Sequence, residues 1–301
     1  MLIGTNNYFY GETRSFTTSE EVPASLNTGW LELPAAPASM GSMISLTHKA
    51  TMNGTVQRNY SFLYDPSMYT SYWVAYPLCS AHLGSGYSAS WQKDPDVASS
   101  KQTDCSGGYG VSLSTTNYSS NSYGRGHQIP NADRNGVDAM NSQTFYSTNC
   151  TPQIQNGFNG SIWSNLEGAV RSAIPSGDTL YVVTGAAFRV VGGSEAITYI
   201  TNSNDNKSIP VPNYYWKVIL KVKRSGTSVT SAKAIGFWLP HQDLGSSKIS
   251  GSPTYADFAV SVDTIEQYTG FNFFPNLPGN DSSGIEATAE ANSSWTDFQS
   301  F

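Results

Sequence analysis

Short runs of apolar and aromatic residues, separated by Gly, Pro, Asn and Ser, recur along the middle of the chain. Runs of this kind are typical of strands, because apolar side chains line one or both faces of a sheet. They predict strands at residues 58–65, 71–78, 179–188, 214–224 and 232–240. In the fourth run, Lys217, Lys221 and Lys223 alternate with apolar residues, which favours a solvated sheet face over a track for phosphates.

Two segments have the period of a helix instead. The first is residues 161–174, where one stripe carries Trp163, Leu166, Val170 and Ile174. The second is residues 263–270, where Asp263 caps the first turn and Glu266 occupies the third position. Gly270 then ends this helix, because glycine readily adopts the left-handed conformation found there. The chain is therefore predicted to mix strands with a few helices.

The same pattern divides the chain into three parts. Residues 1–45 are interrupted by prolines and have no sustained period, which predicts an N-terminal extension on the surface. Residues 46–278 hold the predicted strands and helices and form the main domain, and residues 279–301 form a mobile C-terminal tail. Residues 97–124 are rich in Ser, Gly, Tyr and Asn and predict a long loop. Long loops in compact domains are often functional.

Charge is scarce in this protein. Only 13% of residues are Asp, Glu, Lys or Arg, and the net charge is −6; an average soluble protein has about 25% charged residues. The negative balance argues against a protein that coats nucleic acid through bulk electrostatics. A local basic site stays compatible with this composition.

Residue usage also bears on where the protein acts. No run of about 18 apolar residues is present, so no membrane span is expected. The first residues lack the basic and apolar regions of a signal peptide. Abundant Ser, Thr, Asn, Gly and Tyr with little Lys favours an exported bacterial protein, which is secreted, periplasmic or on the cell surface. The oligomeric state is left open.

Three cysteines, Cys79, Cys105 and Cys150, permit at most one internal disulfide. They are too few for a disulfide scaffold, and none belongs to a CxxC pair. A zinc ribbon or a redox dithiol is therefore unsupported, and the cysteines receive no role.

The scarce charges gather in a few segments. Residues 124–134 read GRGHQIPNADR and place Arg125 and His127 in a predicted loop. Residues 144–153 read TFYSTNCTPQ and contain a strand-like run that ends at Asn149. Asn159 precedes the first predicted helix, on which Glu167 and Arg171 are four residues apart and so adjacent. Taken singly, these residues suit a solvated loop, a helix cap and a surface ion pair.

Their order gives them more weight. The succession R-G-H, T-N-x-x-P-Q and N-x-x-x-W-x-x-L-E-x-x-x-R resembles the DNA/RNA non-specific endonuclease family, the sugar-non-specific nucleases of the ββα-metal class. The resemblance covers roughly residues 58–278. It implies an α+β fold in which a central, mostly antiparallel sheet is flanked by helices.

The resemblance also implies an activity, namely metal-dependent hydrolysis of phosphodiester bonds in DNA and RNA that leaves 5′-phosphate ends. It gives roles to six residues of this chain: His127 as general base that activates water, Asn159 as direct metal ligand, Glu167 as orienter of the metal's water shell, Arg125 and Arg171 as phosphate binders, and Asn149 as a supporting amide. The implied ion is Mg²⁺, with Mn²⁺ as a substitute.

These roles agree with the chemistry of the side chains. A neutral imidazole accepts a proton at neutral pH, which an ordinary carboxylate does poorly. A single amide oxygen with most positions left to water suits Mg²⁺, which gives up its hydration reluctantly, better than zinc. Since every group addresses phosphate and none needs to read a base edge, both DNA and RNA are expected substrates.

The chain departs from the family pattern at two positions. Gly124 stands where the family usually has Asp before R-G-H, and Ala89 stands where some members have an arginine. Arg58, Lys93 and Arg134 are candidates to replace the missing phosphate contact. A catalytically weakened member of the family is therefore an open alternative.

Other functional classes explain less of the sequence. Seven Trp and eighteen Tyr in a chain of low charge suit an exported glycan-binding or nucleic-acid-binding protein, which leaves the motif spacing unexplained. A serine hydrolase is weaker still, because no G-x-S-x-G elbow is present. Asp133 and Arg134 are predicted to form an ion pair within the loop, and His48, His82 and His241 are predicted to be structural.

Overall fold

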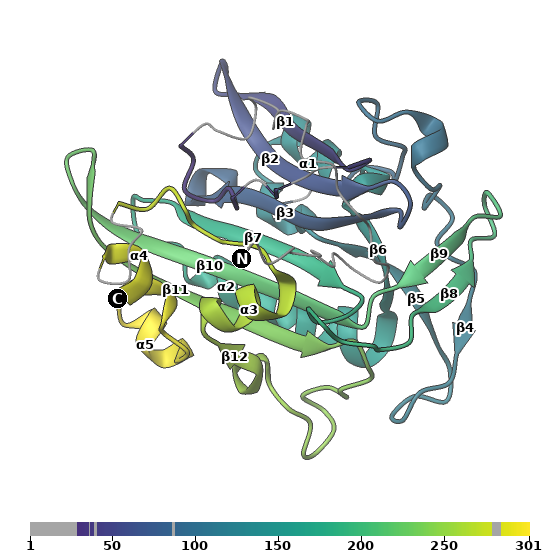
Figure 1. The fold of residues 1–301 in the computed structure, drawn as a ribbon. Coiled ribbons are helices and arrows are strands. Elements are labelled where there is room, and N and C mark those ends of the chain that lie inside the picture. The colour runs from purple at the N-terminus through teal and green to yellow at the C-terminus, as the bar shows by residue number, and fades with distance from the viewer. Residues whose placement is uncertain (1–28, 36, 39–40, 86–87, 279–283) are drawn as a thin grey trace, which may run out of the picture.

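A seven-stranded antiparallel sheet runs through the middle of the computed structural model (Figure 1). The structure describes residues 29–35, 37–38, 41–85, 88–278 and 284–301. The strands of this sheet, in spatial order, are β1 (Ile44–Met52), β2 (Thr55–Asp65), β3 (Thr70–Leu78), β7 (Leu180–Ala187), β10 (Tyr214–Ser225), β11 (Ser228–Pro240) and β12 (Ala259–Val260). All five strands predicted from the apolar runs are confirmed, as β2, β3, β7, β10 and β11.

Two small antiparallel sheets stand beside the large one. One contains β4 (Ser112–Leu113), β5 (Asn121–His127) and β6 (Cys150–Ile154), and the other contains β8 (Thr198–Thr201) and β9 (Ser208–Val211). The sheet of β4, β5 and β6 carries the R-G-H and P-Q motifs, so it positions the candidate site.

Five α-helices accompany the sheets: α1 (Asp138–Thr144), α2 (Ser164–Ser172), α3 (Val262–Thr269), α4 (Ile285–Glu290) and α5 (Trp295–Gln299). Single helical turns lie at η2 (Ser80–His82), η3 (Ser99–Lys101), η4 (Asn131–Arg134), η5 (Ser147–Asn149) and η7 (Tyr255–Phe258), and a wider turn, η6 (Gln155–Trp163), leads into α2. In the described part of the chain, no helix is both long and apolar enough to cross a membrane. The two predicted helices are confirmed as η6 with α2 and as α3.

The start of α3 differs from the prediction. Ser261 is the cap, because its hydroxyl accepts a hydrogen bond from the Thr264 amide at 3.1 Å. Glu266 instead accepts a hydrogen bond from the Phe273 amide at 2.6 Å. Gly270 ends the helix with a φ of 73°, as predicted. The cap prediction was therefore wrong by two residues, because serine caps as well as aspartate does.

The large sheet has two covered faces, which are here called the α2 face and the α3 face. On the α2 face, Leu166 and Val170 of α2 pack against Tyr215 and Ile219 of β10. The α3 face is built in the same way from Val262 and Ile265 of α3, Ala289 of α4 and Trp216 and Val218 of β10. Consecutive residues of β10 thus alternate between two separate hydrophobic cores.

Two lysines of the β10 row, Lys217 and Lys221, point into the α2 face, so the prediction of a solvated face was wrong for them, whereas Lys223 is exposed as predicted. Lys217 is 0% exposed and Lys221 is 7% exposed. Their ammonium nitrogens lie 4.8 Å from the Trp163 ring centroid and 4.6 Å from that of Phe298. Helices α2 and α5 cover the face of β10 that the alternating pattern assigned to solvent. The side chains of a strand alternate between the two faces of a sheet even when both faces are covered, so the pattern did not distinguish the two cases.

The C-terminal segment is folded where the structure describes it. Trp295 and Phe298 of α5 are buried in the core of the α2 face, whereas α4 packs on the α3 face. The chain crosses the edge of β11 between the two helices, where Asn292 Nδ2 donates to the Ala234 carbonyl at 3.0 Å. The prediction of a mobile tail was therefore wrong for residues 284–301.

The predicted N-terminal extension falls mostly on residues 1–28, which lie outside the described residues. Of the described part, Leu33 is fully buried in the core of the α3 face, and the Ala35 amide donates to the Asn272 carbonyl at 2.8 Å. The domain boundaries at residues 45 and 278 stay predictions.

Candidate active site

The candidate residues lie on β5, η5, η6 and α2, around the strand β6 that pairs with β5 and leads into η6 and α2. β5 pairs antiparallel with β6, with Arg125 opposite Pro152 and His127 opposite Cys150. The segment predicted as a loop around His127 is thus a strand, and residues 144–149 are helical turns, so the predicted strand there begins only at Cys150. The strand was not predicted, because the glycines at positions 124 and 126 have a low strand propensity.

His127 ends β5 within an aromatic wall. Its ring centroid lies 4.4 Å from that of Trp91 and 5.0 Å from that of Phe145. Its Nε2 atom is buried and has no hydrogen-bond partner in the described part of the chain. Burial, assisted by the positive charge of Arg125, lowers the pKa of His127 to about 3. The imidazole is therefore neutral at physiological pH.

Arg125 projects from the same strand toward solvent. Its Nη1 donates to the Ser106 carbonyl at 2.6 Å, and its guanidinium carbon lies 5.8 Å from the Trp91 ring centroid. Ser106 belongs to the long irregular segment before β5, so that segment fixes the arginine. Because a guanidinium has five N–H donors, most of them remain for another acceptor.

Asn159 lies on η6, against the backbone of β5. Its Nδ2 donates to Gln155 Oε1 at 3.1 Å. A Cβ at Gly124 would collide with Gln155 Oε1 and would lie 3.4 Å from Asn159 Nδ2. The Gln155 amide thus occupies the space that a side chain at position 124 would need. This arrangement leaves Asn159 Oδ1 without a donor among the described residues.

A glycine allows the chain to turn from β6 into η6. Gly157 has a φ of 80°, which disfavours other residues, and a Cβ there would collide with Asp243 Oδ1. The turn carries Asn159 back toward β5 and begins the helical path to α2.

Glu167 and Arg171 lie on α2 above buried charges of the sheet. Burial raises the pKa of Glu167 to about 7, against the opposing effect of Lys217. Burial lowers the pKa of Lys217 to about 8, and its Nζ has no hydrogen-bond partner in the described structure. Arg171 Nη1 lies 2.9 Å from Asp133 Oδ1, and Tyr76 donates to Asp133 Oδ2 at 2.9 Å. In this group, acidic and basic side chains therefore lie next to one another, Glu167 with Lys217 and Asp133 with Arg171.

Asp133 and Arg134 do not form the predicted side-chain ion pair. Arg134 is fully buried, and its guanidinium donates to the Asp133 carbonyl at 2.8 Å and to Asn59 and Pro77. The Asp133 carboxylate forms an ion pair with Arg171 instead. Sequence adjacency misled the prediction, because neighbouring residues in η4 point in different directions.

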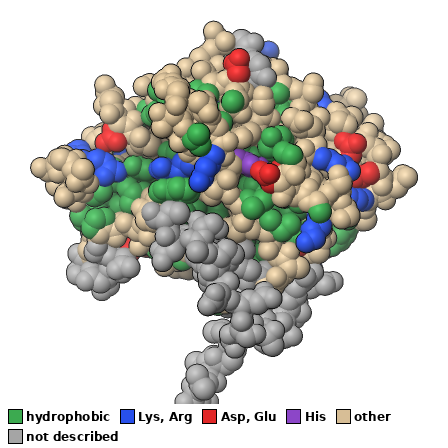
Figure 2. All heavy atoms as spheres, turned by 90° about the horizontal axis from the view of Figure 1, so that it is seen from above, with side chains coloured by type: hydrophobic (Ala, Val, Ile, Leu, Met, Phe, Trp, Pro, Cys, Tyr) green, Lys and Arg blue, Asp and Glu red, His purple; other side chains and the backbone are tan. Residues whose placement is uncertain are grey.

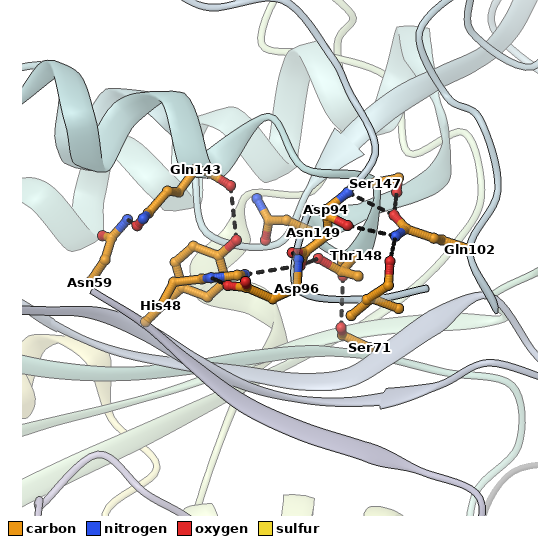
Figure 3. A network of polar contacts seen from close by, with 12 residues as sticks. His48, Asn59, Ser71, Asp94, Asp96, Gln102, Gln143, Ser147, Thr148 and Asn149 are labelled. Atoms are coloured by element: carbon orange, nitrogen blue, oxygen red, sulfur yellow. Dashed lines mark hydrogen bonds and ion pairs between the residues drawn. The ribbon is translucent and has the colours of Figure 1, made fainter. Parts of the chain in front are cut away.

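The side chain of Asn149 is occupied by the backbone. Its Oδ1 accepts a hydrogen bond from the Ile129 amide at 2.9 Å, and its Nδ2 donates to the carbonyls of Ile129 and Thr144 at 3.0 and 2.7 Å. These bonds pin the segment that follows His127 to the turn before β6. Asn149 is among the residues of the buried polar network drawn in Figure 3.

That network contains a group that could hold a metal ion, formed by His48, Asp94 and Asp96. His48 Nε2 lies 2.9 Å from Asp94 Oδ2, and His48 Nδ1 lies 3.3 Å from Asp96 Oδ2 (Figure 3). The Thr148 hydroxyl also donates to Asp94 Oδ2, at 2.6 Å. The two ring nitrogens of His48 thus each face one of the two carboxylates.

His241 is structural, as predicted. Its Nε2 accepts a hydrogen bond from the Ile154 amide at 2.8 Å, and its Nδ1 lies 2.7 Å from the Pro212 carbonyl. Both ring nitrogens are thus engaged, whereas Nε2 of His127 has no partner among the described residues. Histidines 127 and 241 are therefore a natural pair for comparing chemistry with packing.

Only one of the three candidates for the missing phosphate contact stays available. Arg134 is fully buried, and Arg58 is paired with Glu32 at 2.6 Å and lies over the Trp30 ring. Lys93 is partly exposed and follows Trp91, which flanks His127, by two residues. Figure 2 shows Lys and Arg side chains in small separate groups on one face of the molecule, as the low charge content predicts.

The site residues form three groups around β5, η6 and α2. These are Arg125 and His127 around Trp91, Gln155 and Asn159 beside Gly124, and Glu167 and Arg171 with Asp133 and Lys217. Among the described residues, no hydrogen bond or ion pair joins one group to another. Each group holds at least one of the residues selected from the sequence.

Four residues of this region were not predicted from the sequence as site residues: Trp91, Gln153, Gln155 and Lys217. Both amide atoms of Gln153 are buried without partners in the described structure, and a Cβ at Gly126 would collide with its side chain. Gln153 closes the T-N-x-x-P-Q motif, so that motif was a usable signal. The position of Gln155, one helical turn before Asn159, was a weaker indication in the sequence. Lys217 is recognised as a site residue only from its burial in the structure.

The architecture and the motifs correspond to a known family. A profile of the DNA/RNA non-specific endonuclease family matches residues 41–280. The chain belongs to this family. The resemblance inferred from the motifs is thereby confirmed, and the family indicates non-specific nuclease activity and a hydrolase.

The individual proteins to which the chain is similar are also named nucleases. The chain is 29% identical to Nuclease C1 of Cunninghamella echinulata var. echinulata over 187 residues, which cover 62% of this chain and 67% of that protein. It is 27% identical to a nuclease of Nostoc sp. over 240 residues, 78% of each protein. The mitochondrial nuclease EXOG of Homo sapiens is 28% identical over 163 residues, 53% of this chain and 42% of that protein.

A solved structure supports the fold. A chain of the EndoG/EndoGI complex, which concerns the inhibition of EndoG, superposes with a TM-score of 0.58 at 21% identity. The match covers 77% of this chain and 87% of that chain. The predicted α+β, ββα-metal nuclease fold with a mostly antiparallel sheet is thus confirmed.

Proposed function

We propose that this protein is a metal-dependent endonuclease that hydrolyses phosphodiester bonds of DNA and RNA and leaves 5′-phosphate ends. The observation that carries the proposal is His127 at the end of β5, whose buried Nε2 has no hydrogen-bond partner among the described residues. A neutral imidazole in this state takes a proton from the attacking water. Trp91 and Phe145 orient the ring for that step.

Asn159 would hold the metal through Oδ1, because its Nδ2 is already bonded to Gln155. A lone amide oxygen fits Mg²⁺, with Mn²⁺ as a substitute, since such ions keep most of their water. A bound ion would offset the negative charge that develops on the phosphate and on the departing 3′ oxygen. Glu167 would orient the ion's water molecules, which requires its carboxyl group to be ionised.

Arg125 and Arg171 would bind phosphate oxygens. Arg125 is exposed and tethered at one nitrogen only, and Arg171 pairs with Asp133 through Nη1. Each guanidinium therefore keeps donors for a substrate. Asn149 would support the site indirectly, by fixing the backbone after His127. Because these groups address phosphate and not bases, both nucleic acids are substrates of the proposed enzyme.

Export from a bacterial cell is also part of the proposal. It rests on the residue usage, rich in Ser, Thr and Asn and poor in Lys. Cell fractionation of the native host, with the activity or an antibody as the readout, tests it. Recovery of the protein in the cytoplasm alone would contradict it.

The activity is tested with supercoiled plasmid and with RNA, each incubated in Mg²⁺ and in EDTA. Cleavage of both that needs the metal, with products that a 5′-phosphate-dependent exonuclease degrades, is expected. Failure of the wild-type protein with Mg²⁺ and Mn²⁺ would favour the weakened family member instead. Retention on a glycan column without cleavage would favour the binding protein.

A further inference from the structure

Four carboxylates gather on the α3 face, where α3 and α4 meet. Asp263 and Glu266 are three residues apart on α3, and Glu286 and Glu290 are four apart on α4, so each pair lies on one side of its helix. Oxygen atoms of Asp263, Glu266 and Glu290 all lie within 4.8 Å of one another. This cluster is remote from the proposed active site in the fold, because the sheet stands between α3 and α2.

The described residues supply no compensating charge to this cluster. The charged groups that act on Glu290 are Glu266, Glu286 and Asp263, and all are acidic. None of the ion pairs of the described residues includes any of the four. The His48 group differs, because an imidazole lies between its two carboxylates.

Glu290 gives the cluster an independent sign of a missing partner. Its residue is only 6% exposed, and its Oε1 is buried without a hydrogen-bond partner among the described residues. Burial and the neighbouring carboxylates raise its pKa to about 9. A buried carboxyl oxygen without a partner is costly, so a proton or a cation must satisfy it.

We propose that Asp263, Glu266 and Glu290 bind one calcium ion between α3 and α4. Glu266 Oε1 accepts a hydrogen bond from the Phe273 amide, so its second oxygen is the one available. Calcium takes oxygen ligands at about 2.3–2.6 Å in irregular geometry, so oxygens on opposite sides of one ion lie up to roughly 5 Å apart. The separation of the three carboxylates fits that spacing, and three negative charges suit a divalent cation.

Such an ion would secure the C-terminal segment. It links α4 to α3, and α4 leads directly to α5, whose Trp295 and Phe298 complete the core of the α2 face. Removal of calcium should therefore loosen residues 284–301 before the rest of the sheet. The ion is structural and takes no part in cleavage.

The test measures thermal unfolding of the full chain at pH 8 in CaCl₂, in MgCl₂ and in EDTA. The Asn159→Ala variant is the background, so that an ion at the proposed catalytic position does not contribute. Calcium at ten times its dissociation constant should raise the Tm by roughly 4 °C and should slow hydrogen exchange in α4 at least about tenfold. Magnesium should have a smaller effect at equal concentration.

Three variants in this background decide the outcome. Glu290→Gln should abolish the response to calcium, and Asp263→Asn, at an exposed position that does not threaten folding, should weaken the affinity about tenfold or more. Asp138→Asn removes an exposed charge on α1 and should respond like the parent. The proposal is overturned if the parent does not respond and Glu290→Gln is more heat-stable, as a shared proton would require. An equal response in Glu290→Gln or Asp263→Asn also overturns it.

Discussion

The two faces of the large sheet treat buried charge in opposite ways. On the α2 face, Lys217 is buried near Glu167, and Asp133 is paired with Arg171. On the α3 face, the charged groups that act on Glu290 are the other carboxylates of α3 and α4, and no described residue forms an ion pair with any of them. The first face compensates its charges within the chain, whereas the second needs a proton or an ion from outside. Compensation by the chain allows pKa values to be tuned, and its absence creates a demand for a ligand.

The largest expected effect distinguishes the proposed catalytic histidine, His127, from the structural histidine, His241. His127→Ala should lower kcat by about 10²–10⁴-fold, because the proposed general base is lost. Its Tm should fall less than that of His241→Ala, since Nε2 has no partner to lose among the described residues and only the ring contacts with Trp91 and Phe145 are removed. His241→Ala should instead destabilise the fold by about 1–3 kcal/mol, because both ring nitrogens are engaged. Plasmid cleavage and thermal unfolding of both variants check this; equal activity of His127→Ala and wild type would refute the proposed base.

A second prediction concerns the residue that fills the space beside Gly124. Gln155→Leu should weaken Mg²⁺ affinity about 10–100-fold, because Asn159 loses the partner that orients its amide. Gln155→Glu keeps an acceptor there and should retain the affinity. Titration calorimetry with Mg²⁺, together with cleavage at varied Mg²⁺, measures the effect. Unchanged affinity in the leucine variant would show that Gln155 only fills space.

A third prediction uses the buried lysine of the α2 face. Since Glu167 has a pKa raised to about 7 and must be ionised to act, activity should fall as the pH drops through about 7. Lys217→Met removes the positive charge that lowers this pKa, so the acid limb of the profile should move to higher pH. Activity at pH 7 should fall by roughly threefold.

The matched control is Lys221→Met, four residues along the same strand, under α5. It should leave the pH profile of kcat where the wild type has it. A profile that is the same in Lys217→Met and wild type would mean that the buried charges of the α2 face do not govern the reaction.

The smallest expected effect concerns a charge pair that is not buried. Lys233 Nζ lies 2.9 Å from Asp297 Oδ2, and the Asp297 side chain is 55% exposed. Solvent screens such a pair, so Lys233→Ala should change the free energy of unfolding by less than about 1 kcal/mol. Urea unfolding measures it. A much larger loss would mean that this pair, and not the buried core, holds α5 on the sheet.

The sequence was a good guide wherever local pattern decides structure. The apolar runs located five strands, and the stripe from Trp163 to Val170 located α2, since burial of one stripe needs no knowledge of the partner. The spacing of the motifs identified the family, because that spacing is carried by the chain itself. The proposed roles of the six site residues rest on the same motifs and await the tests above.

The sequence was a poor guide wherever a distant segment decides. β5 reads as a loop until β6 pairs with it, and Lys217 and Lys221 of β10 read as solvated until α2 and α5 cover them. Asp133 pairs with Arg171 across 38 residues instead of with its neighbour.

The sequence by itself determined the family, the main strands and the identity of the candidate chemical groups, because periodicity and spacing are local properties. Tertiary structure alone decided which charges are buried, which are paired, and that Gln155 fills the space beside Gly124. Burial and pairing depend on residues far apart in the chain, and they set the cost of each charge. For that reason the ionisation of Glu167 and the uncompensated oxygen of Glu290 are visible only in the folded molecule.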